Sequence, residues 1–242
     1  MKNYRSSIPK AARERVVSTH ESNGEKQKAE YLLNGKVVGV RQFDVDGEIA
    51  TETPFKNGVI HGIVYCFESG PDGRARVNFA EPYRNGLAHG TARQWSLDGE
   101  KLIGTYTMKH GTGLDLWRNW DYERKHYYLS EARYLEDGKW HGFEWWLDED
   151  QTTVFEEHHF WKNLQHGIQR EWNNEGRLRR GFPRYWLNNE RVTKRKYLRA
   201  QASDRSLPPF RAADNLPRRN FPPEVMAAIK SSAEIPVPPA VD

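Results

Sequence analysis

The sequence contains a single cysteine, Cys66, and no apolar run that approaches the ~20 residues of a membrane span. One thiol excludes an intramolecular disulfide framework and a cysteine-based zinc site. The first residues are not followed by the apolar stretch of a secretory signal. We therefore expect a cytoplasmic protein without a transmembrane segment.

Aliphatic residues are also scarce. Hydrophobic residues make up 37% of the 242 positions and charged residues 29%, which is too polar for a thick compact core. Aromatic residues nevertheless reach 12%, which is too many for a disordered chain. Rings cover a large area on a pleated sheet, so this composition favours a thin, elongated fold. The formal net charge of +4 is too small for a dedicated nucleic-acid-binding domain.

A short motif recurs along the chain. It reads Asn-Gly-x-x-His-Gly at residues 57–62 and 85–90, and Asp-Gly-x-x-His-Gly at residues 137–142. Three imperfect copies complete the series at residues 34–39, 110–113 and 163–167. An aromatic residue follows the last glycine of every copy by four or five positions. These residues are Phe43, Phe67, Trp95, Trp117, Trp146 and Trp172. Such self-similarity identifies a repeat protein.

The motif predicts β-hairpins. Asn-Gly and Asp-Gly supply the two positive φ angles of a type I′ turn. Second turn signals such as Asp46-Gly47 and Asp98-Gly99 lie between the copies, so each repeat contains two short strands. The apolar spacing is mostly two, which does not fit helices. We predict an all-β fold: an antiparallel meander of hairpins that forms an open, solenoid-like sheet.

The pattern Φ-x-Asn-Gly-x-x-His-Gly-x-x-x-x-Trp resembles the MORN-variant (second-type MORN) repeat, as carried by the YwqK-type bacterial antitoxin family. The resemblance covers roughly residues 23–180, with a related piece that extends to Ala200. It implies an array of β-hairpins and, through the antitoxin label, the binding of a partner toxin. The copies at Val38, at 110–113 and at Leu164 depart from the pattern. Regular stacking of the hairpins is therefore not predicted at these three copies.

The two ends of the chain differ from the repeats. Residues 1–22 form an N-terminal extension without a clear period, and the repeat domain is predicted to span residues 23–200. It would end in a hairpin turning at Asn188-Asn189 and a short capping helix N-capped by Thr193. Eight of the 13 prolines lie between Pro208 and Pro239, so residues 201–242 are predicted to be a disordered tail, with one helical turn at 224–230.

Several ligand-type residues have a structural interpretation. Five of the nine histidines precede glycine, one per repeat, which favours a turn-forming role over a metal site. Residues 156–159, Glu-Glu-His-His, are rich in ligands, but successive strand residues point to opposite faces. Cys66 lies between two aromatic residues in the sequence, which favours an unreactive side chain that packs in the protein interior. No nucleophile elbow, phosphate loop or zinc-protease motif occurs. We therefore predict no enzyme, no catalytic residue, no metal and no cofactor.

The predicted function is that of a non-enzymatic repeat scaffold that binds a protein partner, in an antitoxin-like or immunity-like way. Exposed rings anchor interfaces, and the candidates for a concave binding face are Tyr65, Tyr127 and Trp145. The alternative is peripheral binding to anionic lipid or to nucleic acid through the basic C-terminal cap. That cap contains Lys194, Arg195, Lys196 and Arg199, which could equally be a solvated helix face.

Overall fold

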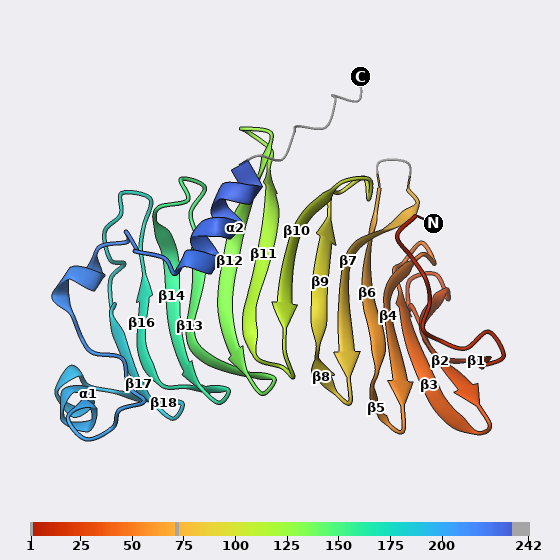
Figure 1. Cartoon of the computed structure of the whole chain (residues 1–242), viewed down its shortest axis with the longest axis horizontal. Helices are drawn as coiled ribbons and strands as arrows, with labels where there is room; N and C mark the ends of the chain where they lie inside the picture. The colour runs from red at the N-terminus through yellow and green to blue at the C-terminus, as the bar shows by residue number, and fades with distance from the viewer. Residues whose placement is uncertain (1, 71–72, 234–242) are drawn as a thin grey trace. The chain divides into compact units, whose positions relative to one another are not determined.

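The structure is a computed structural model that describes residues 2–70 and 73–233. Within these residues the regular structure is mostly β, in two antiparallel sheets, with two α-helices towards the C-terminus (Figure 1). The predicted all-β hairpin meander with a short C-terminal helix is confirmed. The chain divides into two compact units, Met1–Gly111 and Thr112–Asp242. The division falls within the region predicted as the repeat domain (23–200), in the shortened copy at residues 110–113.

The first unit is one meandering sheet in which the main strands pair in the order β1-β2-β3-β4-β6-β7-β9-β10. Two short strands, β5 and β8, pair with β4 and β7 at the hairpin turns. The strands are β1 (Arg13–Thr19), β2 (Lys26–Leu33), β3 (Lys36–Phe43), β4 (Ile49–Lys56), β5 (Val59–Ile60), β6 (Gly62–Ser69), β7 (Ala75–Arg84), β8 (Leu87–Ala88), β9 (Gly90–Trp95) and β10 (Leu102–Met108).

The second unit repeats this plan in the order β11-β12-β13-β14-β16-β17-β18, with β15 paired to β14. Its strands are β11 (Gly113–Asp121), β12 (His126–Glu136), β13 (Lys139–Leu147), β14 (Val154–Trp161), β15 (Leu164–Gln165), β16 (Gly167–Glu171), β17 (Arg184–Leu187) and β18 (Glu190–Val192). The helices are α1 (Lys194–Gln201), the 3-10 helix η1 (Ala212–Asn215) and α2 (Pro223–Ala233). No helix in the described parts of the chain has the length and apolar character needed to cross a membrane.

Seven of the hairpin turns, at the six motif copies and in the last hairpin, adopt the predicted conformation. Each of these seven has two successive residues with positive φ, which defines a type I′ turn. The turns at Asp46-Gly47 and Asp98-Gly99 have a positive φ at the glycine alone. The first residues of the seven type I′ turns are Asn34, Asn57, Asn85, His110, Asp137, Lys162 and Asn188. The imperfect sixth copy therefore turns at Lys162-Asn163, one residue earlier than its sequence suggested, and Asn163 replaces the usual glycine at a φ of 71°.

The repeat histidines do not form turns by adopting a positive φ. Among the described residues the only histidine with a positive φ is His110 (51°), which occupies the first turn position. In three other copies the imidazole Nδ1 instead accepts the backbone N–H of the first residue in the following turn. The bonds join His61 to Asn85 (3.4 Å), His89 to His110 (3.2 Å) and His166 to Asn188 (3.1 Å). These histidines connect successive turns, so the turn-forming interpretation was wrong in its mechanism.

In the first unit the N-terminal extension covers one face of the sheet. Ile8 packs with Ala29, Tyr31 and Phe43, and Tyr4 packs beside Tyr65 and Phe67 in a neighbouring cluster. Glycine is required where the extension approaches most closely, because a Cβ on Gly39 would lie 2.2 Å from the Ile8 side chain. Residues 13–19 of the extension then form the edge strand β1.

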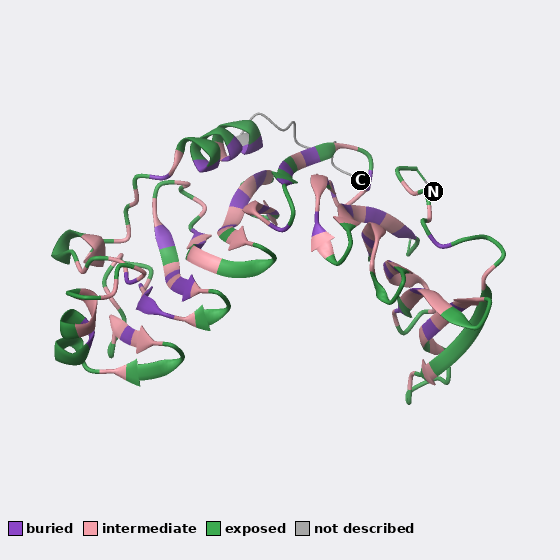
Figure 2. Cartoon of the chain, turned by 60° about the horizontal axis from the view of Figure 1, so that its bottom comes forward, coloured by how far each residue is buried: buried purple, intermediate pink, exposed green. Residues whose placement is uncertain are grey.

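In the second unit the C-terminal segment covers one face of the sheet. Leu207, Phe221, Val225 and Ala228 are buried, and α2 packs on β11 and β12 (Figures 1 and 2). The prediction of a disordered tail over 201–242 is therefore wrong for residues 201–233, whereas residues 234–242 lie outside the described residues. The capping helix is confirmed: Thr193 Oγ1 accepts the Lys196 N–H (3.2 Å) at the start of α1.

We predict that His89→Phe lowers the free energy of unfolding by about 1 kcal/mol, because it keeps a ring but removes the acceptor for the His110 N–H. His110→Asn is the matched control. It places in the turn the residue that other copies carry there, and should be neutral. Urea denaturation of the three proteins gives both values. Equal losses in the two variants would contradict the role of Nδ1 as acceptor.

Candidate functional site

The three aromatic residues predicted to be exposed anchors are buried. Tyr65 and Tyr127 are 3% exposed and Trp145 is 8% exposed. Tyr65 lies against Tyr4, with ring centroids 5.1 Å apart, and Trp145 lies against Phe221 at 5.6 Å. The prediction that these rings are available to a partner is wrong, because segments from the chain's two ends occupy the faces on which they lie.

In the second unit, a one-residue difference in register explains why Trp145 was chosen. Successive strand residues point to opposite faces, so aromatic residues four and five positions after a glycine face different sides in this sheet. Trp172, five after Gly167, is 2% exposed, and its indole N–H donates to the Asn215 carbonyl (2.8 Å). Trp146, four after Gly142, is only partly buried on the opposite face. Its neighbour Trp145 consequently lies on the covered face.

Glu157, on β14, anchors the covering segment of the second unit, which we call the C-terminal strap (residues 207–233). Its carboxylate is 2% exposed and accepts hydrogen bonds from Arg170 (2.5 Å), Arg219 (2.8 Å) and the Trp145 indole (2.9 Å). Burial raises the pKa of Glu157, but the hydrogen bond and charge of Arg219 and the charge of Arg170 outweigh burial and leave it lowered. The strap is thus held to the sheet by the contact of Arg219 with the Glu157 carboxylate.

The strap leaves part of the same face uncovered. Tyr134 is 37% exposed and lies beside His141, which in turn contacts Trp161, and Phe143 is 38% exposed on the next strand. Ring centroids are 6.3 Å apart for Tyr134 and His141, and 4.3 Å for His141 and Trp161. We call these four residues the aromatic patch. Sequence reasoning missed this patch. The spacing of two residues between Phe143 and Trp145 did place both on one face, but the sequence did not show that the strap covers Trp145 and leaves Phe143 exposed.

A depression of about 560 Å³ adjoins the patch. Its lining residues are Trp161, His166, Asn188, Asp204, Arg205 and Ser206. His166 Nε2 lies 3.1 Å from Ser206 Oγ and 3.3 Å from the Asp204 carboxylate, which superficially resembles a catalytic triad. However, Nδ1 accepts the Asn188 N–H, so in the neutral ring the proton is on Nε2. That nitrogen cannot accept the serine proton, and the arrangement does not activate a nucleophile.

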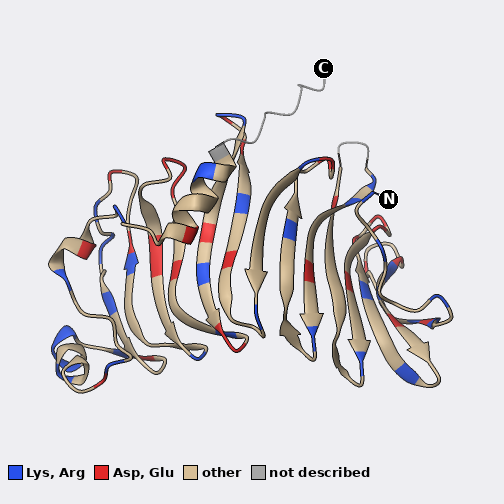
Figure 3. Ribbon diagram, in the orientation of Figure 1, with Lys and Arg blue, Asp and Glu red and all other residues tan. Residues whose placement is uncertain are grey.

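Charged residues occur side by side across β11–β14 (Figure 3). The strand register places several of them in a row on the face opposite to the strap. Arg133 contacts Asp115 (3.1 Å), Glu131 (2.7 Å) and Glu144 (3.8 Å). His158 and Glu156 form a pair at 2.6 Å in the same row. Burial raises the pKa of Glu144 to about 7, Arg133 opposes that shift, and the neighbouring carboxylates Glu131 and Glu156 add to it. Glu131 and Glu144 both lie against Arg133, so the row is partly charge-compensated within the sheet.

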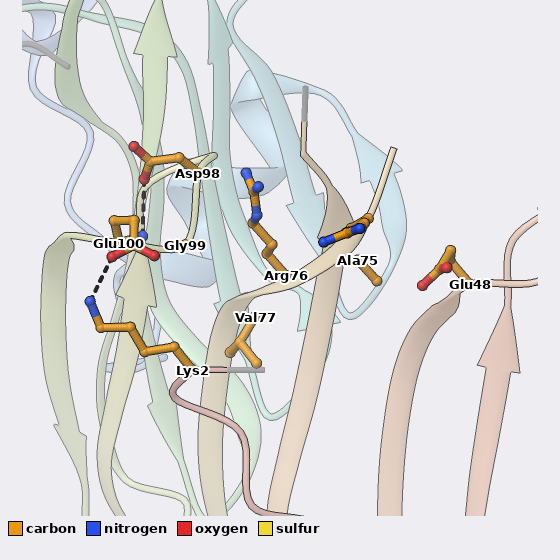
Figure 4. Close-up of a pocket in the computed structure, with 9 residues that line it drawn as sticks. Lys2, Glu48, Ala75, Arg76, Val77, Asp98, Gly99 and Glu100 are labelled. Carbon is orange, nitrogen blue, oxygen red and sulfur yellow. Dashed lines mark hydrogen bonds and ion pairs between the residues drawn. The ribbon is translucent and has the colours of Figure 1, made fainter. Parts of the chain in front are cut away.

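The first unit contains a separate depression of about 460 Å³ (Figure 4). Both signs of charge surround it, and an ion pair between Lys2 and Glu100 (2.6 Å) closes one side. Asp98 is committed to its own turn, where it accepts the Glu100 N–H (3.0 Å). Lys2, Asp98 and Glu100 thus interact with one another or with their own turn.

The four predicted basic residues do lie together on α1. Lys194, Arg195, Lys196 and Arg199 are exposed, while Tyr197 on the other side of the helix is fully buried. Lys196 pairs with Glu190 (2.8 Å), and the Lys194 ammonium lies 3.8 Å from the centre of the Phe210 ring. Arg195 and Arg199 make the basic surface of the helix.

In the described portion of the chain, no three His, Cys, Asp or Glu side chains are grouped so as to hold a metal ion. The free thiol of Cys66 has a pKa raised by burial, so it is not an activated nucleophile. In comparisons with known proteins, no protein-family model matches the chain, and no curated protein shows significant similarity to it. The site must therefore be interpreted from its own geometry.

We predict that Glu144→Gln stabilises the second unit at pH 8 but not at pH 4.5. The folded-state pKa of about 7 lies above the ordinary value of 4.5, so the folded protein holds this proton more tightly than the unfolded chain does. Stability is consequently lost as pH rises from about 4.5 through 7, by up to about 3 kcal/mol. Thermal unfolding of both proteins at the two pH values measures the effect. An equal difference at both values would contradict it.

Proposed function

We propose that this protein is a non-enzymatic repeat scaffold that binds a protein partner, and that the partner docks on the aromatic patch of the second unit. The patch is the single observation that carries the proposal. It replaces Tyr65, Tyr127 and Trp145 as the anchor, because the chain's own segments cover those rings.

The physical argument is that large rings are exposed beside a depression and surrounded by polar groups. Interface hot spots are enriched in tryptophan, tyrosine and arginine, and they lie in pockets from which a ring of weaker contacts excludes water. Tyr134 and Trp161 supply the rings, and Arg205 lies at the edge of the 560 Å³ depression. Phe143 stacks on Trp145 at 5.1 Å, so the exposed patch rests on a rigid, buried layer.

The resemblance to MORN-variant repeats supports the same function. We propose that the chain is a divergent member of that group, because its type I′ turns recur at the positions that carry the motif. The antitoxin-like or immunity-like label implies a toxin as the partner. That label enters only through the resemblance, whereas the docking surface is argued from the geometry.

The exposed cations of α1 favour a second candidate function, peripheral binding to anionic lipid or to nucleic acid. Within the described part of the chain, Lys194, Arg195 and Arg199 form no ion pair with a carboxylate, and Lys196 pairs only with the exposed Glu190. Such contacts are mainly electrostatic, so their affinity falls steeply with salt. Contacts made by rings depend weakly on salt, and this difference separates the two candidates.

We predict that a photo-crosslinking amino acid at Tyr134 or Phe143 captures one and the same protein in the native host. The matched control is Tyr122, which is 77% exposed but lies in the turn between β11 and β12, away from the patch. It should capture nothing specific. With the captured protein in hand, Phe143→Ala should weaken binding at least tenfold, or about 1.4 kcal/mol, and Tyr122→Ala should leave it unchanged.

Salt dependence decides between the two candidates. Affinity for the captured protein should change little between 50 and 200 mM salt. If instead binding is lost steeply with salt and disappears in Arg195→Glu/Arg199→Glu, the surface of α1 is the binding site and the patch proposal fails. Capture from Tyr122 as readily as from Phe143 would also reject the patch.

A further inference from the structure

Both units carry a buried glutamate at the same position of the repeat. Glu52 and Glu157 each lie five residues before the first residue of a type I′ turn, Asn57 and Lys162 respectively. They are 0% and 2% exposed. Four other copies have a small residue at this position. These are Ala29, Ala80, Thr105 and Ala132. The glutamate is therefore a feature of particular repeats rather than of the repeat itself.

Each glutamate is already paired within its own sheet. Arg41 lies directly opposite Glu52 in the strand register and contacts it at 2.8 Å. Arg170 lies directly opposite Glu157 and contacts it at 2.5 Å. A buried carboxylate needs a charged partner, and here the neighbouring strand provides one. Each glutamate therefore has one charged partner within its own sheet, and Glu157 gains a second one from the strap.

The terminal segments add a second set of donors to these paired carboxylates. The Tyr4 hydroxyl (2.6 Å) and the Ser6 hydroxyl (2.8 Å) donate to Glu52, and Arg219 (2.8 Å) donates to Glu157. The two segments share no sequence, yet each docks on a glutamate–arginine pair at the same repeat position. The docking site is thus a property of the sheet, and its occupant differs between the units.

The C-terminal strap lies on the second sheet in the manner of a bound peptide. It meets β14 near an isolated bridge between Thr153 and Arg218 instead of adding a strand. Arg219 reaches Glu157, and Phe221, two residues later, packs on Trp145. Helix α2 then buries one side of itself on the sheet. The buried residues of α2 are Val225, Ala228 and Ser232.

We propose that the C-terminal strap is a ligand bound in cis, and that the same face accepts in trans a segment of another polypeptide. The segment it fits has an arginine two residues before an aromatic residue, followed by an amphipathic helix. Arginine suits the Glu157 site because its guanidinium donates several hydrogen bonds in a fixed plane. This inference rests on the proposed protein-binding function and specifies the partner's chemistry. The partner's segment would take the place of the strap, so the binding surface would continue from the aromatic patch onto the part of the face that the strap covers.

The test uses a fluorescently labelled peptide of residues 207–233 and the full chain. In the chain variant Arg219→Ala/Phe221→Ala the strap is weakened, so the peptide should bind in trans at least tenfold more tightly than it binds the wild-type chain. A peptide carrying Arg219→Ala should lose at least tenfold in affinity for the same variant, and one carrying Met226→Ala, an exposed position of α2, should bind unchanged. Fluorescence anisotropy measures each affinity.

Two results would overturn the proposal. One is a folded variant chain, with wild-type circular dichroism, that does not bind the peptide. The other is a variant whose second unit no longer folds, since the strap would then be an integral layer of the core. Hydrogen exchange on the wild-type chain gives an independent check. Strap amides such as that of Arg219 should exchange at least 100-fold faster than those of β12 and β13, and equal rates would reject a displaceable strap.

These outcomes are distinguishable from failure of the proposed function. The peptide assay needs no external partner, and crosslinking at Tyr134 and Phe143 is done with the strap in place. Specific crosslinking without peptide binding would keep the patch and discard the displaceable strap. Peptide binding without specific crosslinking would leave a peptide site on this face and discard the exposed patch as the docking point.

Discussion

A single sheet made of hairpins exposes both of its faces to water, so aromatic rings on either face remain solvent-exposed unless another segment packs over them. In this protein the covering layer comes from the ends of the chain. Residues near Ile8 cover a face in the first unit, and the C-terminal strap covers a face in the second. Burial of one large side chain contributes about 2–3 kcal/mol, so each layer contributes substantially to the stability of its unit.

The turns were predictable because their cause is local. At the motif copies Asn-Gly and Asp-Gly adopt the two positive φ angles of a type I′ turn, and even Lys162-Asn163 adopts this geometry. The faces were harder, because a single residue of register decides between burial and exposure. Counting aromatic residues at four or five positions after glycine combined both faces, and Trp145 was exchanged for Trp146.

The covering segments could not be predicted because their contacts are non-local. Residues 201–242 have the prolines of a disordered segment and no strand period, and nothing in that stretch shows that Phe221 finds Trp145. The Glu157–Arg219 contact joins positions 62 residues apart. The same reasoning applies to Glu131 and Glu144, whose carboxyl groups meet only because β12 and β13 pair in a particular register. Local patterns specify the hairpins, whereas long-range pairing specifies the sites.

The turns are also joined to one another along the edge of each sheet. The N–H of the second turn residue donates to a carbonyl in the previous copy, as from Gly86 to Ile60 (2.8 Å) and from Asn189 to Gln165 (2.9 Å), beside the histidine bonds. A copy joined in this way ends with acceptors that fit the next turn and begins with donors that fit the previous one. A gene duplication that inserts a whole hairpin would meet matching partners on both sides, so such an array can lengthen by single copies during evolution without a new interface.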